Sequence, residues 1–264
     1  MREVLLEILL GDEELAGFRR AGLPRNCGNV TRRTERNMSE NSHEPTLPVP
    51  PTAMDSETII ALNREQTVSE RDTFTVTRYI TFLNHLRRGT VDVLDVGCNT
   101  GRGGAAMKAH MPGIRLVGLD CVAERVNKLD PTVYQRNVVA FSHDVPLPSG
   151  SFDAIVAGEF IEHVPPAYVL PSLCEFFRLL RLKGQMLLTT PNPRYIRNRI
   201  QGRSVLLDPS HVSQHTASSL RRRLEDVGFS TIRIYGTGRV SELIGPYFPV
   251  RCLYGSYLAV ARKW

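Results

Sequence analysis

The run 158–163, GEFIEH, holds two carboxylates and an imidazole within six residues. If the backbone begins to turn there, Glu159, Glu162 and His163 stand at positions i, i+3 and i+4 and share one face. Two carboxylates crowded into a cleft repel each other unless a cation joins them. An oxygen-rich set with one imidazole suits Mg²⁺ or Mn²⁺ better than Zn²⁺. The spacing therefore predicts a divalent-cation site.

The later segment 207–216, LDPSHVSQHT, offers two more imidazoles, His211 and His215. A metal that binds one or two adjacent hydroxyls lowers their pKa and orients the attacking oxygen. The substrate that such a site favours is a vicinal diol, as in a sugar, a ribose end or a catechol. His163 or His215 is the predicted base that takes the hydroxyl proton.

These residues need a scaffold, and the stretch 91–104, VDVLDVGCNTGRGG, indicates which one. A continuous apolar run that ends in glycines is typical of a buried parallel strand entering a helix. The glycines let the backbone approach a ligand closely, and the helix offers free N–H groups. Asp95 stands near the carboxyl end of this strand, where open α/β sheets bind ligands.

Two further acids follow in the expected places. The run 114–120, IRLVGLD, is a second apolar strand that ends in Asp120, at the distance where such folds bind a ribose. The run 141–153 supplies Asp144 before another strand. A dinucleotide-binding Rossmann protein is the alternative, but its G-x-G-x-x-G pattern is not quite met, because residue 99 is Asn99.

With these features together, the chain resembles the class I S-adenosylmethionine (SAM) methyltransferases over roughly 72–263. VLDVGCNTG matches the family's first motif, Asp120 its ribose acid and Asp144 its adenine-side acid. The resemblance implies an α/β fold, a Rossmann-like doubly wound seven-stranded sheet. It also implies a SAM-binding set of ten residues: Asp95, Gly97, Cys98, Asn99, Gly101, Asp120, Cys121, Asp144, Val145 and Glu159.

The E-x-x-E-H run with a later histidine resembles the metal-dependent plant small-RNA ribose 2′-O-methyltransferases, and ubiquinone-pathway O-methyltransferases have a similar run. On the small-RNA pattern of histidine, four residues and threonine, His211 takes the distal ligand place and His215 an adjoining one. The implied Mg²⁺ or Mn²⁺ ligands are Glu159, Glu162, His163 and His211. Many class I methyltransferases without metal carry a similar run, in which the histidine is a base or a structural hydrogen-bonding group.

Composition limits which classes of fold, location and partner are possible. With 264 residues and 42% apolar content, the chain can build one substantial core, and no apolar run approaches a membrane span. Five scattered cysteines without C-x-x-C spacing predict reduced thiols in a cytoplasmic protein. The net charge of +6 permits an anionic partner or a merely solvated surface. Four arginines in 194–203 border the predicted rim and could bind phosphate or carboxylate.

Two regions are predicted. Residues 1–56 are expected to be a flexible N-terminal extension and linker, with Met38 a candidate native start, and 57–264 the methyltransferase domain. The domain's predicted helices lie over 57–88, 102–111, 122–130, 165–182 and from Thr216 to a stop at Gly228, and its strands over 91–96, 114–120, 134–139, 152–157, 185–190, 230–235 and 256–262. Lys183-Gly184 is predicted as a turn, and Tyr247, Phe248 and Tyr254 as a pocket wall.

The sequence thus predicts a SAM-dependent O-methyltransferase acting on a hydroxyl of a sugar or similar polyol, assisted by a divalent cation. The carbohydrate preference rests on the diol chemistry, the arginine-bordered rim and the lack of an evident lipid-binding stretch. The alternatives are a ribose 2′-O-methyltransferase acting on RNA, a metal-free methyltransferase of a small metabolite, and a non-catalytic SAM-binding partner subunit. A small-molecule or glycan acceptor is favoured over nucleic acid, and a homodimer is left open.

Overall fold

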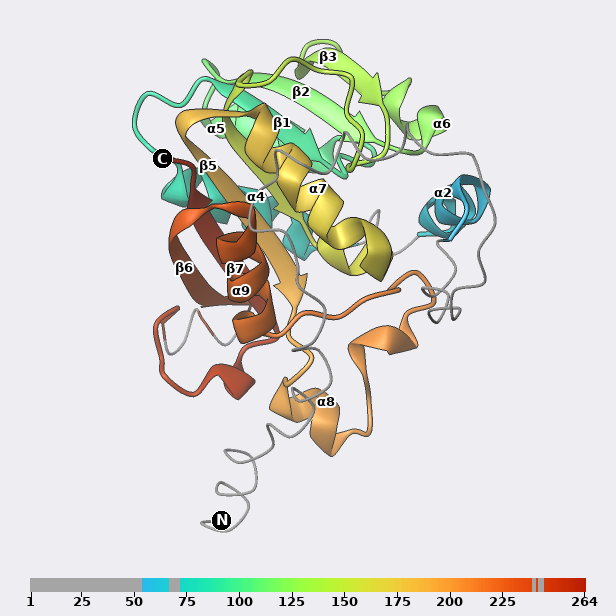
Figure 1. The fold of residues 1–264 in the computed structure, drawn as a ribbon, viewed down its shortest axis with the longest axis vertical. Coiled ribbons are helices and arrows are strands. Elements are labelled where there is room, and N and C mark those ends of the chain that lie inside the picture. Colours follow the sequence, from blue (N-terminus) through green and yellow to red (C-terminus); the bar gives the residue numbers. More distant parts are fainter. Residues whose placement is uncertain (1–53, 67–71, 239–240, 242–244) are drawn as a thin grey trace, which may run out of the picture. The chain divides into compact units, whose positions relative to one another are not determined.

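Seven strands form one mixed sheet in the order β3-β2-β1-β4-β5-β7-β6 (Figure 1). The first five of these neighbours pair in parallel, and β7 pairs antiparallel with both β5 and β6. This confirms the predicted doubly wound seven-stranded α/β sheet. The strands are β1 (Asp92–Val96), β2 (Arg115–Asp120), β3 (Tyr134–Val139), β4 (Phe152–Gly158), β5 (Leu180–Pro191), β6 (Ser230–Thr237) and β7 (Ser256–Arg262).

This computed structural model describes residues 54–66, 72–238, 241 and 245–264, all within the compact unit Glu40–Trp264. The predicted flexible extension over 1–56 lies almost wholly outside the described residues. Within the described ranges, no helix is both long and apolar enough to cross a bilayer.

Helices cover both faces of the sheet. Helices α4 and α5 contact each other, as do α7 and α9, and the two pairs lie on opposite faces (Figure 1). The helices are α2 (Ser56–Arg64), α4 (Phe74–His85), α5 (Arg102–His110), α6 (Ala123–Val126), α7 (Pro166–Leu179), α8 (Ile196–Ile200) and α9 (Ala217–Val227), with 3₁₀ turns η3 (Ile161–His163), η4 (Val205–Leu207) and η5 (Arg251–Leu253).

Local signals explain most of these boundaries. All five residues of β1 are buried, as its continuous apolar run predicts. The hydroxyl of Thr216 accepts the backbone N–H of Ser219 at 3.1 Å and caps α9, which ends at Gly228 with φ +109°. Both ends of α9 are therefore as predicted.

One boundary prediction was wrong. Helix α7 ends at Leu179, and Lys183-Gly184 lies inside β5 instead of forming a turn. Lys183 has φ +66°, typical of an irregularity within a strand. The chain stays in the sheet because the N–H of Lys183 donates to the carbonyl of Lys263 at 2.8 Å.

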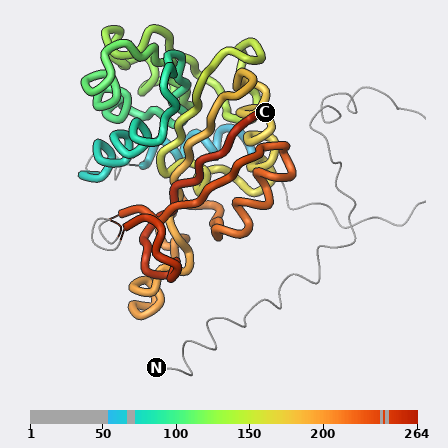
Figure 2. The backbone as a smooth tube through the Cα atoms, turned by 90° about the vertical axis from the view of Figure 1, so that its left-hand side faces the viewer, coloured from blue at the N-terminus to red at the C-terminus, as the bar shows by residue number. Residues whose placement is uncertain are grey.

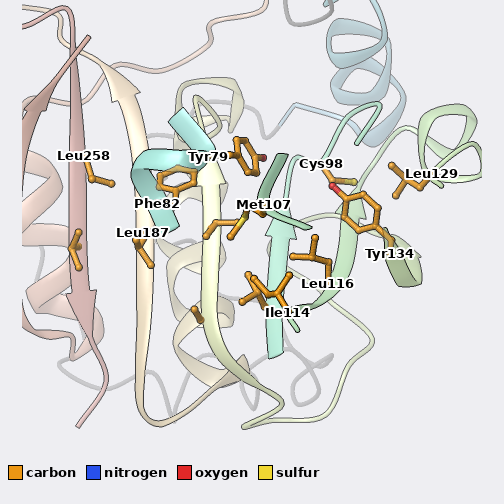
Figure 3. Close-up of a cluster of buried hydrophobic side chains, with 14 of the residues drawn as sticks. Tyr79, Phe82, Cys98, Met107, Ile114, Leu116, Leu129, Tyr134, Leu187 and Leu258 are labelled. Carbon is orange, nitrogen blue, oxygen red and sulfur yellow. The ribbon is translucent and has the colours of Figure 1, made fainter. Parts of the chain in front are cut away.

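A buried carboxylate lies between two tyrosines of the core. Asp95 of β1 accepts the hydroxyl of Tyr79 from α4 and that of Tyr134 from β3, both at 2.6 Å. Figure 3 shows both rings among the buried side chains. Gly103 and Gly104, at the start of α5, leave the space that the rings of Tyr79 and Tyr134 occupy. These two glycines are thus required by packing.

Replacing Gly104 with alanine is expected to lower the free energy of unfolding by about 2–3 kcal/mol. The new Cβ would collide with the Tyr134 hydroxyl, so the ring must move and Asp95 loses one of its two partners. Urea denaturation measures the loss. Gly113→Ala is the matched control, since nothing lies within 4 Å of a Cβ there. Equal losses in the two variants would contradict this account of Gly104.

Candidate active site

The carboxyl ends of the parallel strands border a cavity of about 1150 Å³. Open α/β sheets place ligands at this edge, so the location agrees with the sequence prediction. The lining comes from the glycine turn after β1, the ends of β2 and β4, helix α4 and the segment that follows β5. Such a volume is ample for a nucleoside-sized cofactor together with a small acceptor.

The glycine turn has the backbone that a close approach requires. Gly97 has φ +68°, Asn99 +49° and Gly101 +84°. The turn is tied to β2, because the N–H groups of Asn99 and Val122 donate to the two carboxylate oxygens of Asp120 at 3.1 and 3.0 Å. Burial raises the pKa of Asp120 despite these bonds. The turn and Asp120 therefore form one unit.

The structure brings six of the ten predicted SAM-binding residues to the cavity wall and leaves four away from it. Those on the wall are Gly97, Cys98, Asn99, Asp120, Cys121 and Glu159. The four that do not line the cavity are Asp95, Gly101, Asp144 and Val145. Asp95 has both oxygens engaged by tyrosines, and the N–H of Val145 donates to Glu175 at 3.0 Å.

Asp95 offers a pH-dependent test of this buried position. Burial raises its pKa to about 6, although the hydroxyls of Tyr134 and Tyr79 favour the ionised form. In the unfolded chain an aspartate titrates near about 4, so the folded state binds the extra proton between these values. The stabilising contribution of Asp95 is therefore fully present below about pH 4 and is lost as pH rises through about 6.

The expected result is a difference between wild type and Asp95→Asn that changes with pH. Between about pH 4 and pH 6.5, the free energy of unfolding of the wild type should fall by about 2–3 kcal/mol relative to the variant, which has no carboxyl to titrate. Urea denaturation at a series of pH values measures this. A difference that stays constant over the window would show that Asp95 titrates normally.

Glu162, His163 and His211 come together as predicted. Each offers one ligand atom, and the three atoms lie within 4.8 Å of one another. Glu162 is fully buried; one carboxylate oxygen accepts the Thr190 hydroxyl at 3.0 Å. The other oxygen, Oε1, has no hydrogen-bond partner among the described residues. Burial and the charge of Glu159 raise the pKa of Glu162 well above its usual range.

The two histidines are held in one tautomer. Nδ1 of His163 lies 3.0 Å from the carbonyl of Ser210, and Nδ1 of His211 lies 2.7 Å from that of Val205. Because a carbonyl can only accept, we assign the ring protons to Nδ1, which leaves both Nε2 lone pairs available. The amide nitrogen of Gln66 lies 2.7 Å from the same Nδ1 of His163 and donates to Oδ1 of Asn63 at 3.1 Å. Metal-binding histidines are oriented in this way.

Glu159 does not join this group of three. Its backbone is left-handed, with φ +49°, so Glu159, Glu162 and His163 do not follow one helical face. Its carboxylate lies 3.9 Å from Nε of Arg78 and 3.5 Å from the Ser256 hydroxyl, and it lines the cavity. The prediction that Glu159 also ligates a metal stays a prediction.

His215 lies away from the cavity lining and is almost fully buried. Nε2 is 2.9 Å from the Ser213 hydroxyl, which itself donates to the carbonyl of Ile161, and Nδ1 is 3.2 Å from the Arg223 guanidinium. Burial, together with the charge of Arg223, lowers the pKa of His215 to about 4. Both nitrogens thus have protein partners outside the cavity lining, and the role of His215 as the base stays a prediction.

Several cavity residues were not predicted from the sequence. Arg78 of α4 pairs with Asp72 at 3.1 Å as well as approaching Glu159. His143 stacks on Tyr168, with ring centroids 4.2 Å apart, and more distantly on Phe141; all three line the cavity. Nothing in their spacing along the chain signals this, because each meets its partner only in the folded protein.

The predicted aromatic pocket wall was wrong for this cavity. None of Tyr247, Phe248 and Tyr254 lines the cavity. Tyr254 is buried, and its hydroxyl accepts the N–H of Phe248 and donates to the carbonyl of Gly245. It therefore fastens the loop, while Tyr247 and Phe248 are exposed.

Comparisons with known proteins indicate a methyltransferase domain. A family model described as a methyltransferase domain matches residues 63–234. A SAM-dependent methyltransferase from Archaeoglobus fulgidus has a similar structure, with a TM-score of 0.57 and 19% identity over 71% of this chain and 92% of that one. One from Thermotoga maritima gives 0.56 and 16%, over 78% and 100%.

A third similar structure is phosphoethanolamine N-methyltransferase 2 of Haemonchus contortus, solved with SAM. Its TM-score is 0.52 and its identity 14%, over 71% of this chain and 52% of that one. No curated protein matches the sequence. At such identities these structures share the fold with this chain, and they leave its acceptor open.

Proposed function

The chain belongs to the methyltransferase-domain family, and on that premise we propose that it transfers the methyl group of SAM to a hydroxyl of a sugar or similar polyol, with a divalent cation held by Glu162, His163 and His211. The class I methyltransferase fold expected from the first motif is confirmed. The cofactor, the acceptor and the cation are our own assignments.

One observation supports the cation assignment. A fully buried carboxylate oxygen, Oε1 of Glu162, has no hydrogen-bond partner in the described part of the chain, and two imidazoles lie beside it with their Nε2 lone pairs available. An unpaired buried carboxylate is costly unless a positive charge compensates it. One carboxylate and two imidazoles with backbone-anchored Nδ1 atoms form a donor set that fits Mn²⁺ better than Mg²⁺, because imidazole nitrogen suits transition metals.

The cofactor assignment rests on the glycine turn and Asp120. A Cβ at Gly97 would lie 2.7 Å from the Phe160 ring, so only glycine leaves that backbone open. Asp120 lines the cavity, and a carboxylate at this place can accept ribose hydroxyls. When bound, SAM supplies a methyl group on a positively charged sulfur, and the protein's task is to hold the acceptor oxygen in line with it.

The remaining residues are assigned to removing the proton of the acceptor hydroxyl. When bound, a divalent cation lowers the pKa of a hydroxyl and orients its oxygen. We assign the proton to the Glu159 carboxylate, which lines the cavity and has an oxygen without a hydrogen-bond partner among the described residues. Arg78 beside it keeps the carboxylate in place. His163 is not the base here, since its available nitrogen is assigned to the cation.

The test is SAM turnover on a panel of sugars, catechols, RNA 3′ ends and small amines. Each reaction is run as purified, with EDTA, and with Mg²⁺ or Mn²⁺ restored. Loss with chelator and recovery with metal on a sugar or catechol supports the proposal. Response of the RNA ends alone supports ribose 2′-O-methylation. Turnover indifferent to EDTA overturns the cation assignment and favours the metal-free alternative.

A matched variant pair separates the cation site from general effects. His211→Ala is expected to lose turnover, while His110→Ala is not, because His110 is an exposed histidine whose Nδ1 lies 2.8 Å from the carbonyl of Ala106 on its own helix. Equal turnover in the two variants would remove His211 from the site.

A further inference from the structure

Two segments beside the cavity carry arginines and no acidic residue. Residues 194–207 contain four arginines and residues 247–253 contain one, and neither segment contains an aspartate or glutamate. Together they form what we call the basic rim. Its five arginines are all exposed: Arg194, Arg197, Arg199, Arg203 and Arg251. None of them takes part in the ion pairs found between described residues.

The basic rim also exposes large apolar side chains. Ile200 is 79% exposed, Tyr247 74% and Leu207 64%. Leu206, Phe248 and Val250 are exposed as well. Six of the eleven exposed large apolar side chains in the described part of the protein therefore come from these two short segments. Such a concentration of exposed apolar side chains is typical of an interaction site.

The two segments lie side by side although some 40 residues separate them. Helix α8 contacts the turn η5. Asn192, just before the first segment, donates its side-chain amide to the carbonyls of Arg251 at 3.1 Å and Tyr254 at 2.8 Å. In Figures 1 and 2, α8 and the red segment that holds η5 stay together at the same end of the described fold.

We propose that the basic rim docks the protein on the surface of an anionic lipid bilayer. Arginines interspersed with exposed aliphatic and aromatic side chains suit the boundary between lipid headgroups and acyl chains, where the apolar groups insert and the cations meet lipid phosphates. Charge complementarity selects the anionic surface. Single-stranded RNA fits less well, because its bases stack on aromatic rings, and only two of the six exposed apolar side chains, Tyr247 and Phe248, are aromatic.

Docking there places the cavity entrance at the membrane. The cavity is lined by three residues of the first segment, Tyr195, Arg197 and Asn198. Pro246, next to the second segment, also lines it. The docking itself does not depend on the proposed methyl acceptor.

The experiment is co-sedimentation of the full chain with vesicles of phosphatidylcholine, either pure or with about 30% phosphatidylglycerol, in about 0.1 M salt. We expect binding to the anionic vesicles and little to the neutral ones. Two variants avoid the cavity lining: Arg199→Glu with Arg203→Glu, and Ile200→Ser with Phe248→Ser. Each pair is expected to weaken binding by at least about tenfold.

Matched controls are Arg222→Glu and Leu182→Ser, which change exposed residues of α9 and β5 outside the rim and should bind as wild type. Absence of vesicle binding, equal binding to neutral vesicles, or rim variants that bind as wild type would each overturn the proposal. So would binding of a single-stranded RNA oligonucleotide that depends on Arg199 and Arg203 while vesicles are ignored. Circular dichroism and thermal melting check that every variant is folded.

Discussion

Replacing Glu162 with glutamine is expected to reduce methyl transfer by about a thousandfold and to abolish binding of Mn²⁺. The amide removes the negative charge that compensates the cation and turns one oxygen of the carboxylate into an N–H donor. The fold should tolerate the change, because glutamine still accepts the Thr190 hydroxyl and the burial of an ionised carboxylate is relieved. Turnover and Mn²⁺ paramagnetic resonance measure the two effects.

Glu225→Gln is the matched control, since Glu225 is an exposed glutamate of α9 that pairs only loosely with Arg221, at 3.8 Å. It should leave both turnover and Mn²⁺ binding unchanged. A Glu162→Gln protein that melts as wild type and still binds Mn²⁺ would remove Glu162 from the cation site. One that binds no Mn²⁺ but keeps its turnover would separate the cation from the reaction.

Replacing Asp120 with alanine is expected to weaken SAM binding by a hundredfold or more, on the order of 3 kcal/mol. The carboxylate accepts the N–H groups of Asn99 and Val122, so its loss frees two backbone donors and loosens the glycine turn. It also removes the acceptor assigned to the ribose hydroxyls. Isothermal titration calorimetry with SAM measures the effect.

Asp130→Ala is the control for that variant. Asp130 is an exposed aspartate that accepts the N–H and hydroxyl of Thr132 at 2.8 and 2.7 Å, so it has a similar local role away from the cavity. Its loss should leave SAM affinity unchanged. The glycine turn would not be the cofactor site if Asp120→Ala bound SAM as tightly as the wild type does.

The sheet and the glycine turn could be predicted because their signals are local. Parallel strands buried on both faces need continuous apolar runs, and a turn with positive φ favours glycine or asparagine, as at Gly97, Asn99 and Gly101. The extension of β5 through Lys183-Gly184 could not, since it depends on pairing with Lys263, some 80 residues later.

The cation site was predicted in part for a similar reason. Helical spacing placed Glu159 with Glu162 and His163, but Glu159 takes a left-handed backbone that a glutamate seldom adopts, so it points elsewhere. His215 follows His211 closely in the sequence, yet Ser213 and Arg223 hold it outside the cavity lining. The four arginines of 194–203 could be predicted at the rim of the site, but their association with residues 247–253 could not, because only folding joins the two segments.

The arrangement of Gly104 and Tyr134 makes two distant positions interdependent. The Gly104→Ala substitution is costly only while the tyrosine ring fills the space above it. A Tyr134→Leu chain should accept Gly104→Ala at little further cost, so the two substitutions are non-additive. The same coupling joins Gly103 to Tyr79. In this stretch a change at Gly103 or Gly104 is therefore expected to be tolerated only together with a change at the tyrosine that packs on it.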